Sequence, residues 1–154
     1  MLKEDVISVV EKYYKSIIHD FSVVNAAAMA KSSKLTFKRK NFTEDIENFE
    51  YIKNKLSDFS KVLDILETED KDDEDSIKTK DLLNKNMLAL DDVLENSIDY
   101  FDCMDRIRRK EEVSIKENKA KLQKLKSVMN DFRISLGELD QSYQVLVPNE
   151  DLEE

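Results

Sequence analysis

The stretch LQKLKSVMNDFRISLGELDQSYQVL, residues 122–146, decides the fold class. Its apolar residues recur every three or four positions, which places them along one side of an α-helix. They are Leu122, Leu125, Met129, Phe132, Leu136, Leu139, Tyr143 and Leu146. A seven-residue apolar repeat sustained over this length predicts a helix that packs on another helix through a coiled-coil-type seam.

The same register extends back to residue 83, but its middle is ambiguous. The seam positions there hold the polar residues Arg108, Glu111 and Asn118. One interpretation is a single continuous rod over residues 76–146, whose seam these polar side chains interrupt. The other is a helical hairpin that turns near residues 109–113.

Two features favour the hairpin. Ser114 and Glu117 have the spacing of a capping box, which marks the start of a helix. A turn before Ser114 would also bring the acidic arm, residues 91–105, level with the lysine-rich arm, residues 116–126. We therefore predict two antiparallel helices in this half of the chain.

Two further helices are predicted upstream. The first, over about residues 3–33, carries two neighbouring apolar stripes, as expected for a helix packed against more than one partner. The second, over about residues 43–66, follows a basic polar segment at 31–42 and ends at an acidic run at 67–75. Like charges in such a run repel one another and bury nothing, so we expect loops on both sides of this helix.

The chain as a whole therefore predicts an all-α fold, an antiparallel bundle of about four long helices in a single domain, residues 1–146. The helices are expected at about 3–33, 43–66, 76–109 and 114–146. Only one Gly and one Pro occur in 154 residues, which argues against folds rich in turns. Val147 and Pro148 end the last helix, and residues 147–154 are expected to be an acidic, disordered tail.

Charge restricts the classes of function. The formal net charge is −9, which disfavours a general nucleic-acid binder because phosphate contact requires concentrated Lys and Arg. The N-terminal residues do not have the layout of a signal peptide, and no apolar run approaches the roughly 18 residues of a transmembrane segment. We expect a location in the cytoplasm, or in the nucleus of a eukaryote.

Residues suited to catalysis or metal binding are scarce. His19 is the only histidine and Cys103 the only cysteine, so a zinc site built on these residue types lacks ligands. The acidic run at 67–75 does not fit a calcium-binding EF-hand loop, which needs Gly at its sixth position. We expect no enzymatic activity, no cofactor and no metal, and a structural role for Cys103 beside the seam.

These observations predict a non-catalytic helical interaction protein, a scaffold or adaptor subunit that assembles with other helical proteins, or with itself, in an intracellular complex. The alternative is a small acidic secretion-type chaperone or helical effector that binds a client protein. The candidate partner-binding residues lie on the first and last helices: Val6, Val10, Tyr13, Ile17, Leu122, Leu125, Met129, Phe132 and Leu139. The same residues are equally suited to the protein's own core.

The basic segment is a second candidate contact. Its cations are Lys34, Lys38, Arg39 and Lys40, interleaved with two apolar side chains. Such a segment suits an acidic partner, a phosphate or a membrane surface. It is equally suited to packing beside the protein's own acidic loop.

Overall fold

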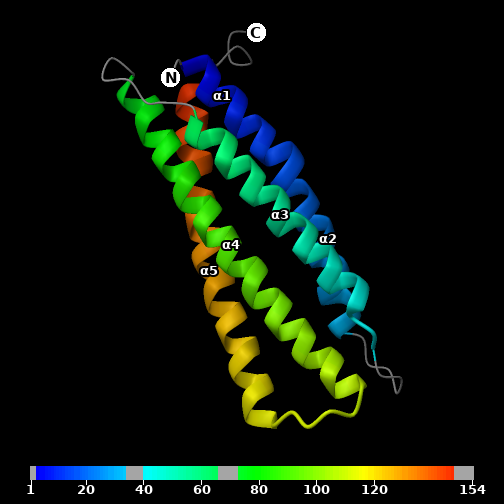
Figure 1. The fold of residues 1–154 in the computed structure, drawn as a ribbon. Coiled ribbons are helices and arrows are strands. Elements are labelled where there is room, and N and C mark those ends of the chain that lie inside the picture. The colour runs from blue at the N-terminus through cyan, green and yellow to red at the C-terminus, as the bar shows by residue number, and fades with distance from the viewer. Residues whose placement is uncertain (1–2, 34–39, 66–72, 148–154) are drawn as a thin grey trace.

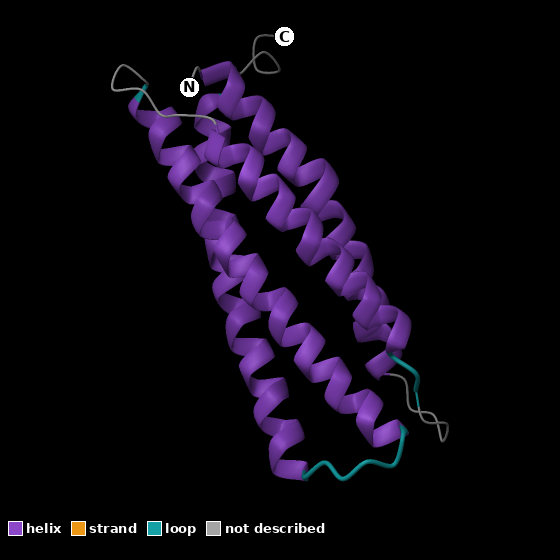
Figure 2. Ribbon diagram, in the orientation of Figure 1, coloured by secondary structure: helices purple, strands orange, loops and turns teal. Residues whose placement is uncertain are grey.

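The computed structural model describes residues 3–33, 40–65 and 73–147. Within these ranges the chain forms four helical segments and no strand (Figure 2). The first segment is continuous and consists of α1 (Lys3–Lys12), η1 (Tyr13–Ile18) and α2 (His19–Ser33). The others are α3 (Thr43–Ile65), α4 (Glu74–Arg108) and α5 (Ile115–Leu146). The predicted all-α helical bundle is confirmed.

Successive segments run antiparallel and form an elongated bundle (Figure 1). α4 lies between α3 and α5 and packs against both, while α1 contacts α4 and α5 and α2 contacts α3. The end of α2, the start of α3 and the turn between α4 and α5 lie at one end of the bundle. The start of α1 and the end of α5 lie at the opposite end.

α4 and α5 are separate helices, so the alternative of one continuous rod is wrong. α4 ends in a Schellman motif, in which the backbone N–H of Glu111 donates to the carbonyl oxygen of Arg106 at 3.0 Å and that of Lys110 to Ile107 at 3.1 Å. Lys110 has a φ of 62°, the left-handed conformation that glycine adopts most easily.

Ser114, the first residue of the predicted capping box, caps the start of α5. The hydroxyl of Ser114 accepts a hydrogen bond from the backbone N–H of Glu117 at 3.0 Å. α4 begins at Glu74, two residues before the position expected from the apolar pattern, because the side chain of Asp73 accepts from the backbone N–H of Asp75 and caps the helix.

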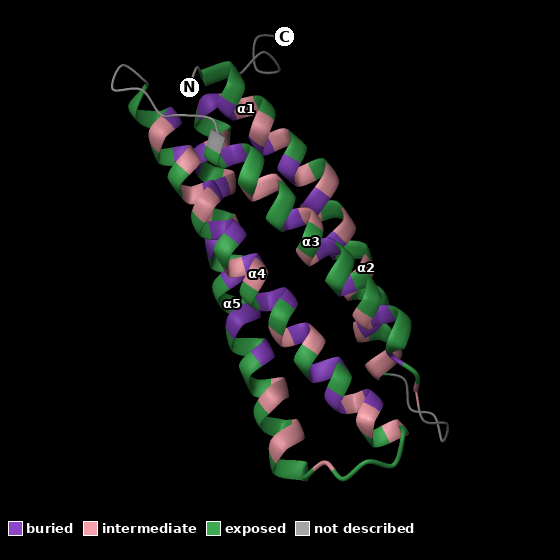
Figure 3. Ribbon diagram, in the orientation of Figure 1, coloured by how far each residue is buried: buried purple, intermediate pink, exposed green. Residues whose placement is uncertain are grey.

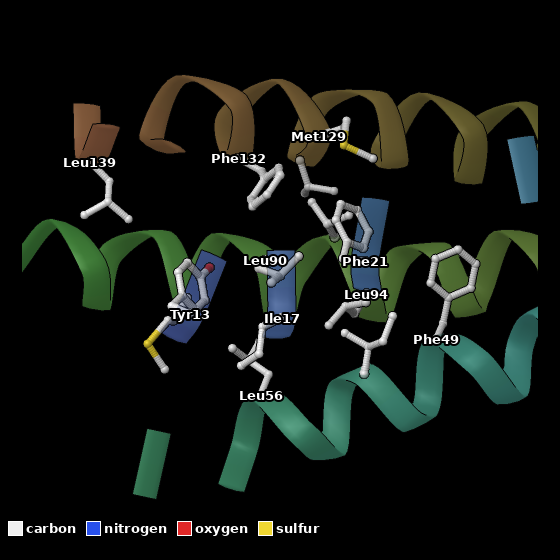
Figure 4. Packing of buried hydrophobic residues seen from close by; sticks show 14 of the residues in the cluster. Tyr13, Ile17, Phe21, Phe49, Leu56, Leu90, Leu94, Met129, Phe132 and Leu139 are labelled. Carbon is white, nitrogen blue, oxygen red and sulfur yellow. The ribbon is translucent and has the colours of Figure 1, made fainter. Parts of the chain in front are cut away.

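The core runs along the axis of the bundle, and the outward faces of the helices are exposed (Figure 3). Side chains from α1, η1, α2, α3, α4 and α5 meet there, and in Figure 4 those of Tyr13, Ile17, Leu56, Leu90 and Leu94 lie close together. Burying one such side chain contributes about 1.5–3 kcal/mol to stability. The apolar stripes of all four segments therefore share one interior.

The first segment contains a π-helical turn, η1, in which the backbone N–H of His19 donates to the carbonyl oxygen of Tyr14 five residues earlier. Such a turn holds more residues than an α-helical one and changes which residues face inward. Two adjacent tyrosines consequently reach different helices. Tyr13 bonds to Asn86 of α4, and Tyr14 bonds to Asp140 of α5. This geometry accounts for the two neighbouring stripes in the sequence.

The ion pairs between α4 and α5 differ from those that the charge pattern predicts. Lys85 pairs with Glu138 at 3.2 Å, and Arg106 lies 3.8 Å from Glu117, so α4 supplies the cations. On α4, the carboxylate of Asp91 pairs instead with Lys53 of α3 at 3.2 Å. The hairpin is correct, but its lysine-rich arm is not neutralised by α4.

Candidate functional site

The candidate partner-binding residues of the first and last helices face the interior of the bundle. Eight of them expose 7% or less of their surface: Val6, Val10, Tyr13, Ile17, Leu125, Met129, Phe132 and Leu139. Leu122 is half-buried and packs against the same core. A partner would reach the eight buried residues only if the bundle opened, so binding through them stays a prediction. The surface that the folded chain offers lies elsewhere.

Only Lys40 of the basic-loop candidates falls within the described residues, and Lys34, Lys38 and Arg39 lie outside them. Lys40 is half-buried and donates to the carbonyl oxygen of Ser32 at 3.2 Å. The acidic loop beside which the basic segment was expected to pack lies mostly outside the described residues, so both interpretations of the segment stay predictions.

A buried carboxylate fixes the start of α3 against the end of α4. Asp105 accepts hydrogen bonds from the backbone N–H of Phe42 at 3.1 Å and from Nε of Arg108 at 2.8 Å. The hydrogen bond from Arg108 and the one from the Phe42 N–H lower the pKa of Asp105 although its burial opposes this. The carboxylate is therefore ionised at neutral pH and links the start of α3 to the end of α4.

Two tyrosines join the first helical segment to α5. The hydroxyl of Tyr14 donates to the carboxylate of Asp140, and that of Tyr143 donates to Glu11 at 2.9 Å. Desolvation by burial, followed by the hydrogen bond to Glu11, raises the pKa of Tyr143 to about 12. Both hydroxyls therefore act as neutral donors at physiological pH and hold the helices in place.

The cysteine has a structural environment. Cys103 exposes 1% of its surface, and its Sγ lies 3.7 Å from Oδ1 of Asn118 on α5. Burial raises the pKa of this thiol, which lowers the fraction present as the nucleophilic thiolate. Among the described residues, no group of three or more His, Cys, Asp or Glu side chains is placed to hold a metal ion.

Two hollows follow one another along the outer side of α3 and α4, with volumes of about 440 Å³ and 380 Å³. We call them together the acidic groove. Their lining residues on α3 are Glu50, Lys53, Asn54, Ser57, Ser60, Lys61 and Asp64. Those on α4 are Asn84, Met87, Leu88, Asp91, Glu95, Ile98 and Asp99. Five of these lining residues are acidic and two are basic. α3 forms one wall of the acidic groove and α4 forms the other.

Leu88 is the most exposed apolar residue of the acidic groove. It exposes 72% of its surface, whereas Met87 beside it is buried and contributes to the core. An isolated exposed leucine is common on protein surfaces. Here it stands in a groove between two helices, with half-buried Ile98 in the neighbouring hollow, so apolar and acidic groups alternate along one surface.

A second charged surface lies on α5. Lys119, Lys126 and Arg133 are all exposed and follow one another at seven-residue spacing, so they form one row along the helix. We call them the cationic row. Within the described residues none of the three has an ion-pair partner. The next positions on this face, at 123, 130 and 137, hold uncharged residues.

Reasoning from the sequence missed the acidic groove because the pairing of α3 with α4 is not visible in either helix alone. A signal was present in α4, where Leu88 lies just outside the apolar seam that contains Met87 and Leu90. An apolar residue on the solvent side of an amphipathic helix is the kind of feature that marks a contact surface.

The chain matches no protein family, no curated protein and no solved structure. Among the helices that the structure describes, none combines the length and the apolar character needed to cross a membrane.

Proposed function

We propose that this protein is a non-catalytic interaction protein, a structural or adaptor subunit that binds a helix of another protein chain in the acidic groove. The observation that carries the proposal is the exposure of Leu88, 72% of its surface, in a groove whose two walls are helices. Covering this exposed leucine with a partner is favourable, because burial of apolar surface contributes about 25 cal/mol per Å² to the free energy of binding.

The dimensions of the groove suit a helix. Its α3 wall runs from Glu50 to Asp64, which is about 21 Å at roughly 1.5 Å per residue. Two packed helices leave a channel between their ridges, into which the side chains of a third helix insert. Binding of an amphipathic helix in such a channel is a recurrent mode of protein recognition.

The charge of the groove specifies the chemistry of the partner. Glu50, Asp64 and Asp99 are exposed and have no ion-pair partner among the described residues. Of the two lysines, Lys53 already pairs with Asp91. An approaching helix therefore gains by carrying Lys or Arg beside its apolar stripe, and an acidic helix is repelled.

The experiment uses two synthetic helical peptides of about 20 residues, one built from Leu and Lys and the other from Leu and Glu. We expect the Lys peptide to bind the full chain, measured by fluorescence anisotropy, and the Glu peptide not to bind. Leu88→Lys should weaken binding of the Lys peptide about tenfold or more, because it removes the apolar contact and adds a like charge, and about 1.4 kcal/mol corresponds to a factor of ten.

Val23→Lys is the matched control, because Val23 is also an exposed apolar residue, at 58%, but lies on α2 away from the groove. This variant should bind the Lys peptide as the unmodified chain does. Equal weakening by both substitutions, or equal binding of the two peptides, would contradict the proposal.

A further inference from the structure

We infer that the helix that occupies the acidic groove is α5 of a second copy of this chain, which presents its cationic row. The inference rests on the proposed function and names the partner. It predicts head-to-tail assembly of identical chains, in which each copy offers a groove on one side and a row on another.

The charges of the row and the groove are complementary. α5 carries six cations and two acids between Ile115 and Arg133, in a chain whose net charge is −9. The groove carries five acids and two lysines. Copies that approach at random repel one another because of their net charge, so an oriented contact of row with groove is the favourable one.

The row and the groove also match in length. From Lys119 to Arg133 the row extends about 21 Å, at roughly 1.5 Å per residue, which is the extent of the groove from Glu50 to Asp64. The row also has half-buried Leu122 beside it, between the levels of Lys119 and Lys126. The row therefore offers cations for the acidic residues of the groove and a partly exposed leucine for contact with Leu88.

The row and the groove lie on different helices of each copy. α4 separates α3 from α5, and within the described ranges these two helices do not contact each other. The groove and the row of one copy are therefore available at the same time. An interface between two different surfaces does not close on itself in a dimer, so it extends from copy to copy until a rotation closes it.

The experiment uses two variants that each lack one surface. The row variant carries Lys119→Glu, Lys126→Glu and Arg133→Glu, at three exposed positions. Sedimentation velocity of the full-length unmodified chain should show species larger than a monomer that grow with concentration. The row variant alone should sediment as a monomer over the same range.

The groove variant carries Leu88→Gln, Glu95→Gln and Asp99→Gln, also at exposed positions. It should be a monomer by itself. An equimolar mixture of the two variants retains one intact groove and one intact row, so it should form a one-to-one complex and nothing larger. A larger assembly would show that a further surface is involved and would overturn the head-to-tail arrangement.

The matched control carries Lys3→Glu, Lys12→Glu and Lys15→Glu, which change the net charge by the same amount at exposed positions of α1 and η1. It should assemble as the unmodified chain does. A monomeric unmodified chain at all concentrations, or a mixture of variants that stays monomeric, would overturn the inference.

Failure of this inference can be told apart from failure of the proposed function. If the unmodified chain is a monomer but binds the Leu–Lys peptide, the groove accepts a basic helix of another protein, and only self-assembly is wrong. If the chain is a monomer and binds neither peptide, both proposals are wrong.

Discussion

The hydroxyl of Tyr13 donates a 2.6 Å hydrogen bond to Oδ1 of Asn86, and both side chains are completely buried. Nδ2 of Asn86 donates in turn to Oγ of Ser135 at 3.2 Å and to the carbonyl oxygen of Phe132 at 3.3 Å. One polar chain thus crosses the apolar interior from η1 through α4 to α5. A shift of any of these helices along the others would leave a buried amide without partners, which costs about 1–3 kcal/mol.

Tyr13→Phe should destabilise the protein by about 1–3 kcal/mol, because it leaves Oδ1 of buried Asn86 without a donor. In an Asn86→Leu background the same substitution should cost less than about 0.5 kcal/mol, since no acceptor remains to be left unpaired. Urea unfolding of the four proteins of this cycle measures the coupling. Additive effects of the two substitutions would contradict the role given to this bond.

Leu125→Asp should abolish folding, because Leu125 exposes 1% of its surface and the core offers no partner for a carboxylate at that position. Circular dichroism in the far ultraviolet would then show loss of helix. Gln123→Asp adds the same charge at an exposed position of α5 and should change stability by less than about 0.5 kcal/mol. A folded Leu125→Asp protein would place this part of α5 on the surface.

Gly137→Ala should stabilise the protein by about 1 kcal/mol, which is the difference in helix propensity between the two residues. A β-carbon at Gly137 would have no atom within 4 Å, so the added methyl group meets no obstruction. The melting temperature should rise by about 2–4 °C for a chain of this size. The reverse change at exposed Ala120 of α5, Ala120→Gly, should lower it by a similar amount.

Lys110→Gly should also stabilise, by about 1 kcal/mol, for a different reason. The φ of 62° at Lys110 is unfavourable for a residue with a β-carbon and is easily adopted by glycine. Glu112→Gly in the same turn is the control, because positive φ among the described residues other than glycine is confined to Lys110. Glu112→Gly relieves no unfavourable backbone conformation, so it should be neutral or destabilising. A stabilisation of equal size at both positions would refute the conformational argument.

We expect the protein to lose stability in acid because of the environment of Asp105. Its pKa is lowered in the folded chain, so its carboxylate stabilises the fold above the ordinary aspartate pKa of about 4, and this stabilisation is lost as the pH falls through the lowered value. Asp105→Asn should cost about 2–3 kcal/mol at pH 7, because it removes the charged acceptor of Arg108.

The pH dependence of unfolding checks this assignment. The difference in the free energy of unfolding between the unmodified chain and Asp105→Asn should be constant at neutral pH. It should shrink once the pH falls below about 4. A difference that does not change with pH would mean that the charge of Asp105 contributes nothing to the fold.

Much of the architecture could be predicted because its determinants are local. The apolar spacing of residues 122–146 and the capping box at Ser114 each involve residues within a few turns of one another. The π-helical turn could not be predicted, since no local residue pattern marks it and the acceptors of Tyr13 and Tyr14 lie on two helices distant in the sequence. The role of Asp105 was hidden for the same reason, because its partner Phe42 lies in a distant part of the chain.

The functional surface was harder to predict than the fold. Apolar periodicity shows that a helix face is covered, but not whether the cover is another helix of the same chain. Val10 and Leu139 satisfy the pattern equally well in both cases, and the structure places them in the interior. The acidic groove combines residues of α3 and α4 that are polar, widely separated and unremarkable until the two helices pair.

The π-helical turn η1 has a consequence for how this gene can change. Because the turn from Tyr13 to Ile18 accommodates an additional residue, the helix before it and the helix after it keep independent phases. Loss of one codon there would leave a regular α-helix in which Phe21 keeps its orientation relative to Val10, toward the interior. Elsewhere in the first helical segment a single-codon insertion has no turn to absorb it. The six residues of this turn are therefore the part of the first helical segment in which loss of a codon is best tolerated, because the side chains before and after it keep facing the interior.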